Sequence, residues 1–427
     1  MERKGLLKNK PYLYLICSQI VSSLGDWLDT LALLALVALK WEATPFEMTG
    51  VGLCMLAPMV VLGPIAGIFA DRYERKTMMI ISDVFRCLLV LSFVFTTELW
   101  QLYILLMLKS AFASLFVPAK NGKLKEIVPE EDMQAAMSIS GMIDSGSKII
   151  GPMISGLIVS LIGIQWAFYL DATTFILSAF LLIGVPRRVR VVKNPVEEMS
   201  SVRSRNQMLQ GLKEGFNIFK NLPILLFGLI VLSVTILVVQ LADTQLMILL
   251  RGVEGINPVD LSGYAIAANG VGMFIMSLFF SKRKIHSTVS WMAVGAFGLG
   301  LAFIAGGLSV QLSALLIVIL FPFIFLFSGF AIDAIIVPFQ VSVQKNTPVE
   351  YSGRVFGTIN SMTTLASLIG MVSGGFLAEI FGVANAYIIS GSLLVLVGII
   401  VYTMKYRFEG RDYHAKGKRG LQGETPL

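Results

Sequence analysis

Charged residues of this chain stand inside long apolar stretches, where a charge is costly unless it is paired or hydrated. Asp26 and Asp29 are three residues apart, which puts both carboxylates on one face of a helix. Two carboxylates this close in a low dielectric favour the uptake of a proton by one of them. We therefore expect a proton or cation site here. The alternative is that both carboxylates bond neighbouring helices or stay ionised at the outer mouth.

Other charges in apolar stretches extend this set. Asp144 and Lys148 are four residues apart and are expected to pair with each other or with Asp26, either as a switch or as a neutralised structural pair. Asp333 is an isolated acid deep in an apolar stretch and is a candidate for binding substrate or a proton. Asp171 stands near the start of another apolar stretch, so we predict that it caps a helix.

Apolar composition decides which elements must hold these residues. Of the 427 residues, 56% are hydrophobic and 14% are charged, with a mean hydropathy of +0.78. Soluble domains carry about 25% charged residues, so a water-soluble globule would lack residues to cover its surface. A helix needs about 20 apolar residues to cross a bilayer. The sequence predicts an all-α membrane protein with twelve transmembrane helices, near 12–39, 48–70, 77–96, 100–119, 134–162, 166–185, 223–250, 260–281, 287–307, 311–340, 354–381 and 383–404.

The distribution of basic residues predicts the orientation. If the N-terminus is cytoplasmic, the outer loops hold only Lys40 and Arg251, whereas Arg86, Lys109 and Lys148 fall within spans and all other Lys and Arg residues face inward. Such an excess of cations on one side fixes topology. We expect a multi-pass protein of a bacterial cell (plasma) membrane with both termini in the cytoplasm.

Internal repetition divides the chain into two halves. Val117-Pro118 recurs as Val337-Pro338, and the glycine-rich run that ends at Gly163 recurs in the run that ends at Gly382. The predicted organisation is an N-terminal six-helix half at 1–185, a cytoplasmic linker at 186–222, a C-terminal six-helix half at 223–405 and a cytoplasmic tail at 406–427.

Three motifs in the first half resemble those of a known family. The turn between the second and third spans resembles the loop signature Gly-x-x-x-Asp-Arg-x-Gly-Arg-Lys of the major facilitator superfamily, with Glu74 in place of the second glycine. The matching residues are Gly67, Asp71, Arg72, Arg75 and Lys76, and Asp83 and Arg86 are expected to extend this gating network. The resemblance implies that Asp71 bonds the end of a helix of the other half near Gly353 and Arg354.

The second motif begins at Lys109-Ser110 and continues with Pro118-Ala119 and Val128-Pro129. It resembles a pattern of the macrolide-efflux branch of the drug:proton antiporters, in which an arginine associated with proton transfer stands where this chain has Lys109. The substitution keeps the charge but loses the planar guanidinium.

The third motif contains Gly151, Pro152 and Gly156. It resembles the antiporter motif Gly-x-x-x-x-Gly-Pro-x-x-Gly-Gly, which is associated with exporters, and Ser155 replaces one glycine. Proline removes a backbone hydrogen bond and small residues permit close packing, so we expect a pliable helix.

Together the resemblances imply a major facilitator fold in which two halves rock around a substrate site near mid-membrane. The expected function is proton-coupled efflux of lipophilic or cationic small molecules, with the proton as coupling ion. The alternatives are a lipid or lysophospholipid flippase, a metabolite exporter of the same fold, or a membrane sensor or partner protein that transports nothing.

Missing motifs narrow these classes. The chain lacks a phosphate-binding loop of the Gly-x-x-x-x-Gly-Lys-[Ser/Thr] type, so we expect no ATP-driven step. His286 and His414 stand in loops, which argues against a metal site. No nucleophile-base pattern indicates an enzyme, and the positive-inside rule explains the net charge of +7 without nucleic acid. We expect a monomer without cofactor or metal, whose partners are the bilayer and a small-molecule substrate.

Overall fold

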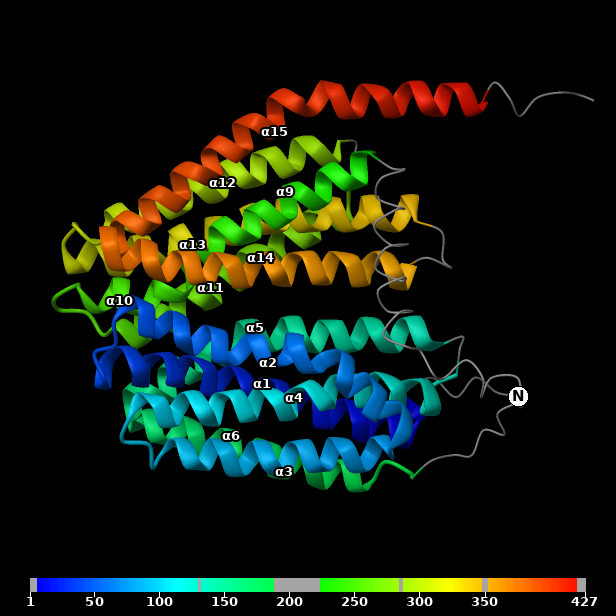
Figure 1. Ribbon diagram of the computed structural model, residues 1–427, viewed down its shortest axis with the longest axis vertical. Coiled ribbons are helices and arrows are strands. Elements are labelled where there is room, and N and C mark those ends of the chain that lie inside the picture. The colour runs from blue at the N-terminus through cyan, green and yellow to red at the C-terminus, as the bar shows by residue number, and fades with distance from the viewer. Residues whose placement is uncertain (1–5, 130–131, 188–222, 284–286, 348–351, 421–427) are drawn as a thin grey trace, which may run out of the picture. The chain divides into compact units, whose positions relative to one another are not determined.

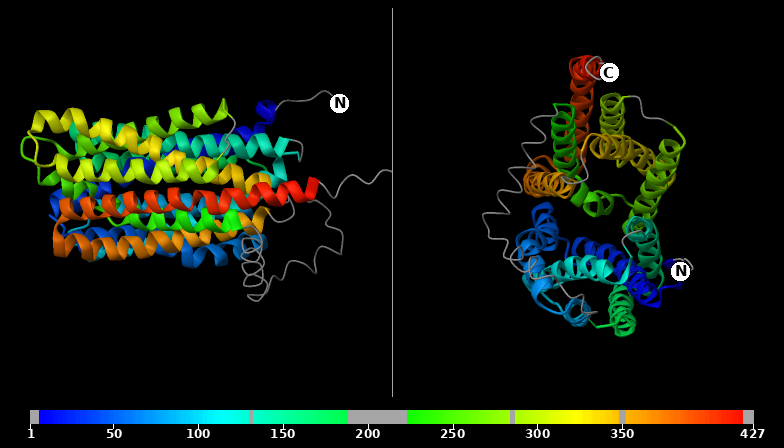
Figure 2. Two further views of the ribbon diagram at one scale, coloured as in Figure 1. Left: turned by 90° about the horizontal axis from the view of Figure 1, so that it is seen from above. Right: turned by 90° about the vertical axis from the view of Figure 1, so that its right-hand side faces the viewer.

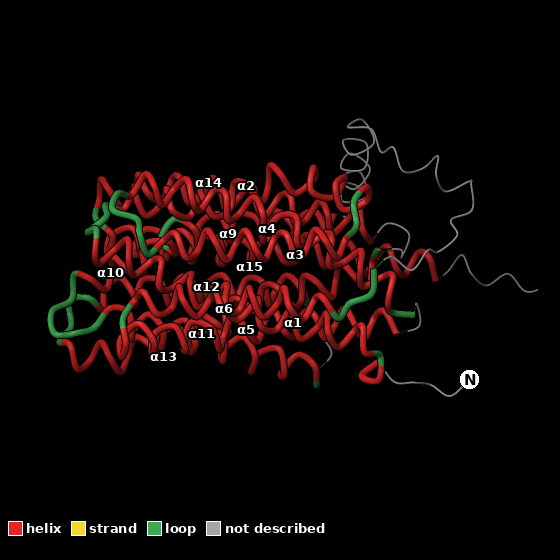
Figure 3. The backbone as a smooth tube through the Cα atoms, turned by 90° about the horizontal axis from the view of Figure 1, so that it is seen from below, coloured by secondary structure: helices red, strands yellow, loops and turns green. Residues whose placement is uncertain are grey.

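A computed structural model of the chain describes residues 6–129, 132–187, 223–283, 287–347 and 352–420 (Figure 1). Among these residues the regular structure is entirely helical and no strand is present (Figure 3). The predicted linker at 186–222 lies outside the described residues, apart from its first two positions.

Each predicted span corresponds to a helical segment (Figure 1). The helices are α1 (Lys10–Ala35), α2 (Pro45–Arg72), α3 (Arg75–Phe93), α4 (Leu99–Ile127), α5 (Met133–Ile162), α6 (Ile164–Ile183), α9 (Pro223–Gln240), α10 (Leu246–Arg251), α11 (Pro258–Ser281), α12 (Thr288–Ser309), α13 (Ala314–Asn346), α14 (Ser352–Phe381) and α15 (Val383–Gly420). Within the described residues, 10 helical stretches are long and apolar enough to cross a membrane. The all-α, multi-span prediction is confirmed.

The seventh predicted span is interrupted. We expected one helix over 223–250, but α9 ends at Gln240 and a 3-10 turn at Asp243–Gln245 precedes α10. The Gln245 side chain leaves the helical register to donate to the carbonyl of Pro45 at 3.1 Å and to the Thr49 hydroxyl at 3.2 Å. The segment after the break is thereby bonded to α2.

Single glycines join two pairs of consecutive helices. Gly163 stands alone between α5 and α6, and Gly382 stands alone between α14 and α15. Their φ angles are +102° and +82°, a region that favours glycine because it has no Cβ. A single glycine with a positive φ angle therefore joins two helices at matching positions of the internal repeat.

Two compact units can be distinguished by their contacts. The first holds α1 to α6, α10, most of α11 and the start of α13, and the second holds α9, α12, α14, α15 and the remainder of α11 and α13. This grouping is not a test of the predicted half boundaries, which stay a prediction.

In the first unit, α1 packs against α5 and α6, while α3 packs against α4 and α6 (Figure 2). Close approach of α1 to α6 depends on Gly25, because a Cβ at this position would overlap the side chains of Asp171 and Thr174. An apolar core toward one end of these helices includes Tyr12, Leu15 and Met79. Polar side chains on α1 and α6 are thereby brought together.

In the second unit, glycines again set helix distances. Backbone atoms of α12 and α15 meet where a Cβ on Gly300 would contact the carbonyl of Gly391 at 2.6 Å. The core of this unit is built from α9, α12, α13 and their neighbours, with Leu229, Leu299 and Phe339 fully buried.

The glycines of the third motif are packing positions on α5. Gly151 lies against Trp27 of α1, so that an added Cβ would overlap the Trp27 side chain. Gly156 faces Gly263 of α11, with 3.6 Å between a Cβ built on Gly156 and the Gly263 Cα. Pro152 stands inside α5, and its carbonyl faces Gly263. Close packing at this motif is observed, whereas its pliability stays a prediction.

We predict that Gly151→Ala lowers the stability of the protein by about 1–3 kcal/mol, because the new methyl group displaces Trp27. Gly146→Ala is the matched control on the same helix, since among the described residues no atom beyond its chain neighbours and its own helix backbone lies within 4 Å of its added Cβ. Alanine favours a helix over glycine, so this control is expected to unfold at the wild-type temperature or above. Thermal unfolding in detergent measures both variants, and equal melting temperatures would contradict the packing role.

Candidate functional site

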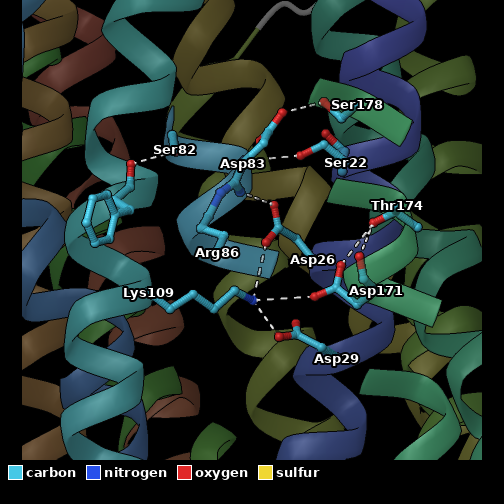
Figure 4. A network of polar contacts seen from close by, with 12 residues as sticks. Ser22, Asp26, Asp29, Ser82, Asp83, Arg86, Lys109, Asp171, Thr174 and Ser178 are labelled. Atoms are coloured by element: carbon cyan, nitrogen blue, oxygen red, sulfur yellow. Dashed lines mark hydrogen bonds and ion pairs between the residues drawn. The ribbon is translucent and has the colours of Figure 1, made fainter. Parts of the chain in front are cut away.

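Polar residues on four helices of the first unit meet around a common centre. On α1, Ser22, Asp26 and Asp29 follow a helical period, and on α6 Thr174 and Ser178 extend the face of Asp171. Helices α3 and α4 add cations and another acid. We call Asp26, Asp29, Asp83, Arg86, Lys109 and Asp171 the charged cluster (Figure 4).

Lys109 of α4 is surrounded by carboxylates. Its Nζ lies 2.5 Å from Asp29 Oδ2, 3.4 Å from Asp26 Oδ1 and 3.9 Å from Asp171 Oδ2. The lysine is 8% exposed and lies 5.7 Å from the centre of the Phe175 ring. One ammonium group thus contacts three acids from two helices, α1 and α6.

Arg86 of α3 is the second cation of the cluster. Its guanidinium donates to Asp83 at 2.5 Å, to Asp26 Oδ2 at 3.1 Å and to the Ser22 hydroxyl at 3.3 Å. The group also lies over the Phe175 ring, with 4.2 Å between Cζ and the ring centre. A planar, multi-donor group suits this position because it bonds two carboxylates at once.

Asp171 corrects one sequence-based expectation. We predicted a helix cap, but Gly163 precedes α6 and Asp171 lies two turns into the helix, fully buried. The predicted span 166–185 began only two residues after the observed start of α6, so the cap prediction was wrong because Asp171 was already inside the helix. The period of three and four residues from Asp171 to Thr174 and Ser178 was the signal that could have identified this polar face.

The charges of the cluster do not balance. Four carboxylates stand against two cations, and Asp29 Oδ1 and Asp171 Oδ2 are buried without a hydrogen-bond donor among the described residues. An unpaired buried charge costs several kcal/mol or is neutralised by a proton. Within the described residues, no group of three or more His, Cys, Asp or Glu side chains is arranged to hold a metal ion.

A cavity of about 390 Å³, lined by both polar and apolar side chains, adjoins the cluster, and we call it the polar cavity after the charged and hydrogen-bonding residues in its wall. Asp26 and Arg86 line it, and the side chain of Asp26 is 39% exposed, far more than those of the other cluster members. The remaining lining comes mostly from α1, α4 and α5: Gln19, Ser22, Ser23, Met59, Ala113, Phe116, Val117, Lys120, Asn121, Met137, Ser140, Gly141 and Asp144. Asp26 is therefore the member of the charged cluster that is most accessible to a small molecule bound in the cavity.

Asp144 lies at the wall of the polar cavity rather than in the cluster. Its carboxylate accepts from Gln19 Nε2 at 2.9 Å, while Lys120 donates to Ser140, which in turn donates to Gln19. The side chain of Lys148 is not among those described, so the predicted pair with Asp144 stays a prediction.

The other predicted site residues lie elsewhere. Asp333 of α13, in the second unit, is buried and accepts from Ser277 at 2.5 Å. Asp83 and Arg86, which we grouped with the gating loop, make their described ion pairs within the charged cluster and also bond Ser178 and Ser22 beside it.

The loop between α2 and α3 is short, as predicted, because only Tyr73 and Glu74 separate the helices. Arg75 donates to the carbonyl of Gly122 at 2.7 Å and to Glu126 at 2.9 Å, and Lys76 donates to the carbonyl of Ile183 at 2.7 Å. The side chains of Asp71 and Arg72, and the surroundings of Gly67, lie outside the described part of the structure. The predicted gating contact of Asp71 therefore stays a prediction.

We predict that Arg86→Met lowers stability by about 3–5 kcal/mol, because Asp83 is then left buried without its cation. The double variant Arg86→Met/Asp83→Asn is expected to recover much of this loss, since the uncompensated charge is removed together with its partner. Thermal unfolding of both variants in detergent checks the pair. A double variant that is less stable than Arg86→Met would contradict the account.

Comparisons with known proteins fit this architecture. The family model of the Major Facilitator Superfamily matches residues 15–370. An uncharacterized MFS-type transporter of Bacillus subtilis (strain 168), YfiS, is 42% identical over 426 residues, which cover 99% of this chain and 100% of the relative. Macrolide efflux protein A of Streptococcus pyogenes is 25% identical over 360 residues, covering 80% of this chain and 83% of the relative.

Solved structures support the fold. The crystal structure of the nucleoside transporter NupG superposes with a TM-score of 0.70 at 15% identity and covers 92% of this chain and 98% of the NupG chain. At this identity the likeness concerns the fold alone. The family match, the related sequences and the helical architecture agree, and the chain belongs to the Major Facilitator Superfamily of multi-pass membrane transporters.

Proposed function

We propose that this protein is a secondary active exporter that couples the entry of protons to the efflux of lipophilic or cationic small molecules. The observation that carries the proposal is the surplus of two carboxylates over cations in the charged cluster, together with the exposure of Asp26 to the polar cavity. The cell membrane of a bacterium, cytoplasmic termini and a monomeric state are part of the same proposal.

The two excess carboxylates give a physical reason for a proton and a cationic substrate to exchange with each other. Negative charge in a low-dielectric setting is relieved either by a proton or by a cationic group, so the two compete for the same excess charge. A cationic substrate in the polar cavity is attracted by Asp26, and protonation of the cluster weakens that attraction. Alternating access then carries a proton inward in one orientation and substrate outward in the other.

Sequence relatives favour export over import. Macrolide efflux protein A is an efflux protein by name, and it aligns with 80% of this chain. The antiporter motif around Gly151, Pro152 and Gly156 is also typical of exporters, and its glycines pack against neighbouring helices here.

The polar lining favours a second candidate. Gln19, Asn121 and Ser140 present amide and hydroxyl groups to the cavity, which suit a polar metabolite better than a wholly lipophilic drug. A metabolite exporter of the same fold is therefore the second candidate, and a lipid or lysophospholipid flippase is the third.

We predict that an imposed pH gradient drives ethidium or a macrolide across the membrane of proteoliposomes that contain the protein. Asp26→Asn and Asp29→Asn are expected to abolish the gradient-driven movement, because Asp26 is the carboxylate that faces the cavity and Asp29 is the carboxylate nearest Lys109. Asp333→Asn is the comparison variant, since this buried acid is the proton candidate that lies outside the charged cluster, where it contacts Ser277.

Folded protein that moves neither compound under the gradient would overturn the multidrug proposal. The same vesicles would then be tested with polar metabolites and with labelled lysophospholipid, which separate the second candidate from a flippase. Loss of movement in Asp333→Asn alone would transfer the coupling role to the second unit.

A further inference from the structure

We propose that Asp29 of α1 and Asp171 of α6 form a carboxyl pair that holds one proton between them, distinct from the Asp26 carboxylate that faces the cavity, and that Lys109 links the two sites. The inference deepens the proposed function, because it identifies the proton site and separates it from the substrate site. Sequence reasoning had assigned Asp171 no part in transport.

The pair is defined by burial and by one shared cation. Asp29 is 2% exposed and Asp171 is fully buried. Both carboxylates point toward the Lys109 ammonium, at 2.5 Å for Asp29 Oδ2 and 3.9 Å for Asp171 Oδ2 (Figure 4). Two acids within reach of one ammonium leave one negative charge without a cation.

Unpartnered oxygen atoms mark where a proton fits. Asp29 Oδ1 and Asp171 Oδ2 have no hydrogen-bond donor among the described residues. The other oxygen of Asp29 accepts from Lys109, and Asp171 Oδ1 accepts from the Thr174 hydroxyl at 3.1 Å. A proton on either carboxylate supplies a missing donor and removes the excess charge, so it satisfies both needs at once.

Asp83 provides a contrast within the same cluster. It is also fully buried, but one oxygen accepts from Arg86 at 2.5 Å and the other from the Ser178 hydroxyl at 2.6 Å. Both oxygens therefore have donors, and the guanidinium balances the charge. Burial alone does not make a proton site, and within the charged cluster only the Asp29–Asp171 pair has buried oxygens that lack donors among the described residues.

The charges facing the pair come from each neighbouring helix. Helix α1 contributes Asp26, α3 contributes Arg86, whose guanidinium also bonds Asp83, and α4 contributes Lys109. On α5 the described titratable group is Asp144, whose partners on α1 are Gln19 and Ser23. Lys109 is the one cation among the described residues that contacts both members of the pair.

Through Lys109, protonation of the Asp29–Asp171 pair changes the negative charge that Asp26 presents to the cavity. With the pair ionised, the two negative charges hold the ammonium, and Asp26 keeps excess charge for a cationic substrate. When the pair takes up a proton from water as an O–H bond, its charge falls from two to one, it holds the ammonium less strongly, and Lys109 shifts toward Asp26, 3.4 Å away, and attracts more of its charge. The substrate cation is then released, and loss of the proton to water restores the first state.

Infrared difference spectroscopy tests whether the Asp29–Asp171 pair is protonated, and it does not depend on a transport assay. Purified protein in detergent near neutral pH is compared with each variant in the region of the carbonyl stretch of protonated carboxylic acids. We expect the wild-type protein to show a band that Asp29→Asn and Asp171→Asn both lose. Asp83→Asn is the matched control, a buried acid of the same cluster, and it is expected to keep the band.

A binding measurement tests whether Lys109 couples protonation of the Asp29–Asp171 pair to the affinity for a cationic substrate at Asp26. The dissociation constant of ethidium, followed by fluorescence, is expected to rise as pH falls for the wild-type protein. We expect this rise to be about tenfold in the wild-type protein and to be lost in Asp171→Asn. Asp171→Glu, which keeps the carboxyl group, is expected to restore both the band and the pH dependence. Melting temperatures verify that each variant is folded.

The outcomes separate this inference from the proposed function. If the pH gradient drives transport but Asp171→Asn keeps the infrared band and the pH dependence, the proton is held elsewhere and the pair is refuted. If wild-type protein shows the band and Asp171→Asn loses it while no gradient drives transport, the pair stands and the proposed function falls. A wild-type protein that lacks the band refutes the pair outright.

Discussion

Charge that is buried in an apolar helix bundle must be neutralised by groups close at hand, and the first unit is arranged around this constraint. Four carboxylates and two cations from α1, α3, α4 and α6 lie together, although each costs free energy when it leaves water. Arg86 neutralises Asp83 and donates a hydrogen bond to Asp26, whereas Lys109 forms ion pairs with three acids. The incomplete balance separates this arrangement from a purely structural ion-pair network.

Helix packing supplies the precision that the charges require. Gly25 brings α1 against α6 so closely that Asp171 and Thr174 occupy the space of a side chain, and Gly151 allows Trp27 to approach α5. Small residues at these positions let backbones meet, and in a membrane such packing is a main source of helix association. The cluster thus depends on glycines that carry no charge, and changes in them are expected to disturb the ion pairs indirectly.

Sequence patterns predicted most of the fold because apolar length is a strong signal in membrane proteins. Short joins near Gly163 and Gly382 also followed from the predicted spans, although the span after Gly163 was expected to begin at residue 166 and α6 begins at Ile164. The break after Gln240 was not foreseeable, since the contacts of Gln245 with α2 that accompany it leave no mark on hydropathy. Likewise, Asp26, Asp29 and Lys109 stood out as charges in apolar spans, but their meeting with Asp83, Arg86 and Asp171 depends on which helix faces pack together.

Proton release on substrate binding is the most direct test of the claim that substrate and proton compete at the charged cluster. Purified protein in weakly buffered detergent solution would be mixed with ethidium while the pH is followed with an indicator dye. Our account predicts acidification with saturating ethidium, absent in Asp171→Asn protein that still binds the dye. Saturable ethidium binding to the wild-type protein without any proton release would contradict it.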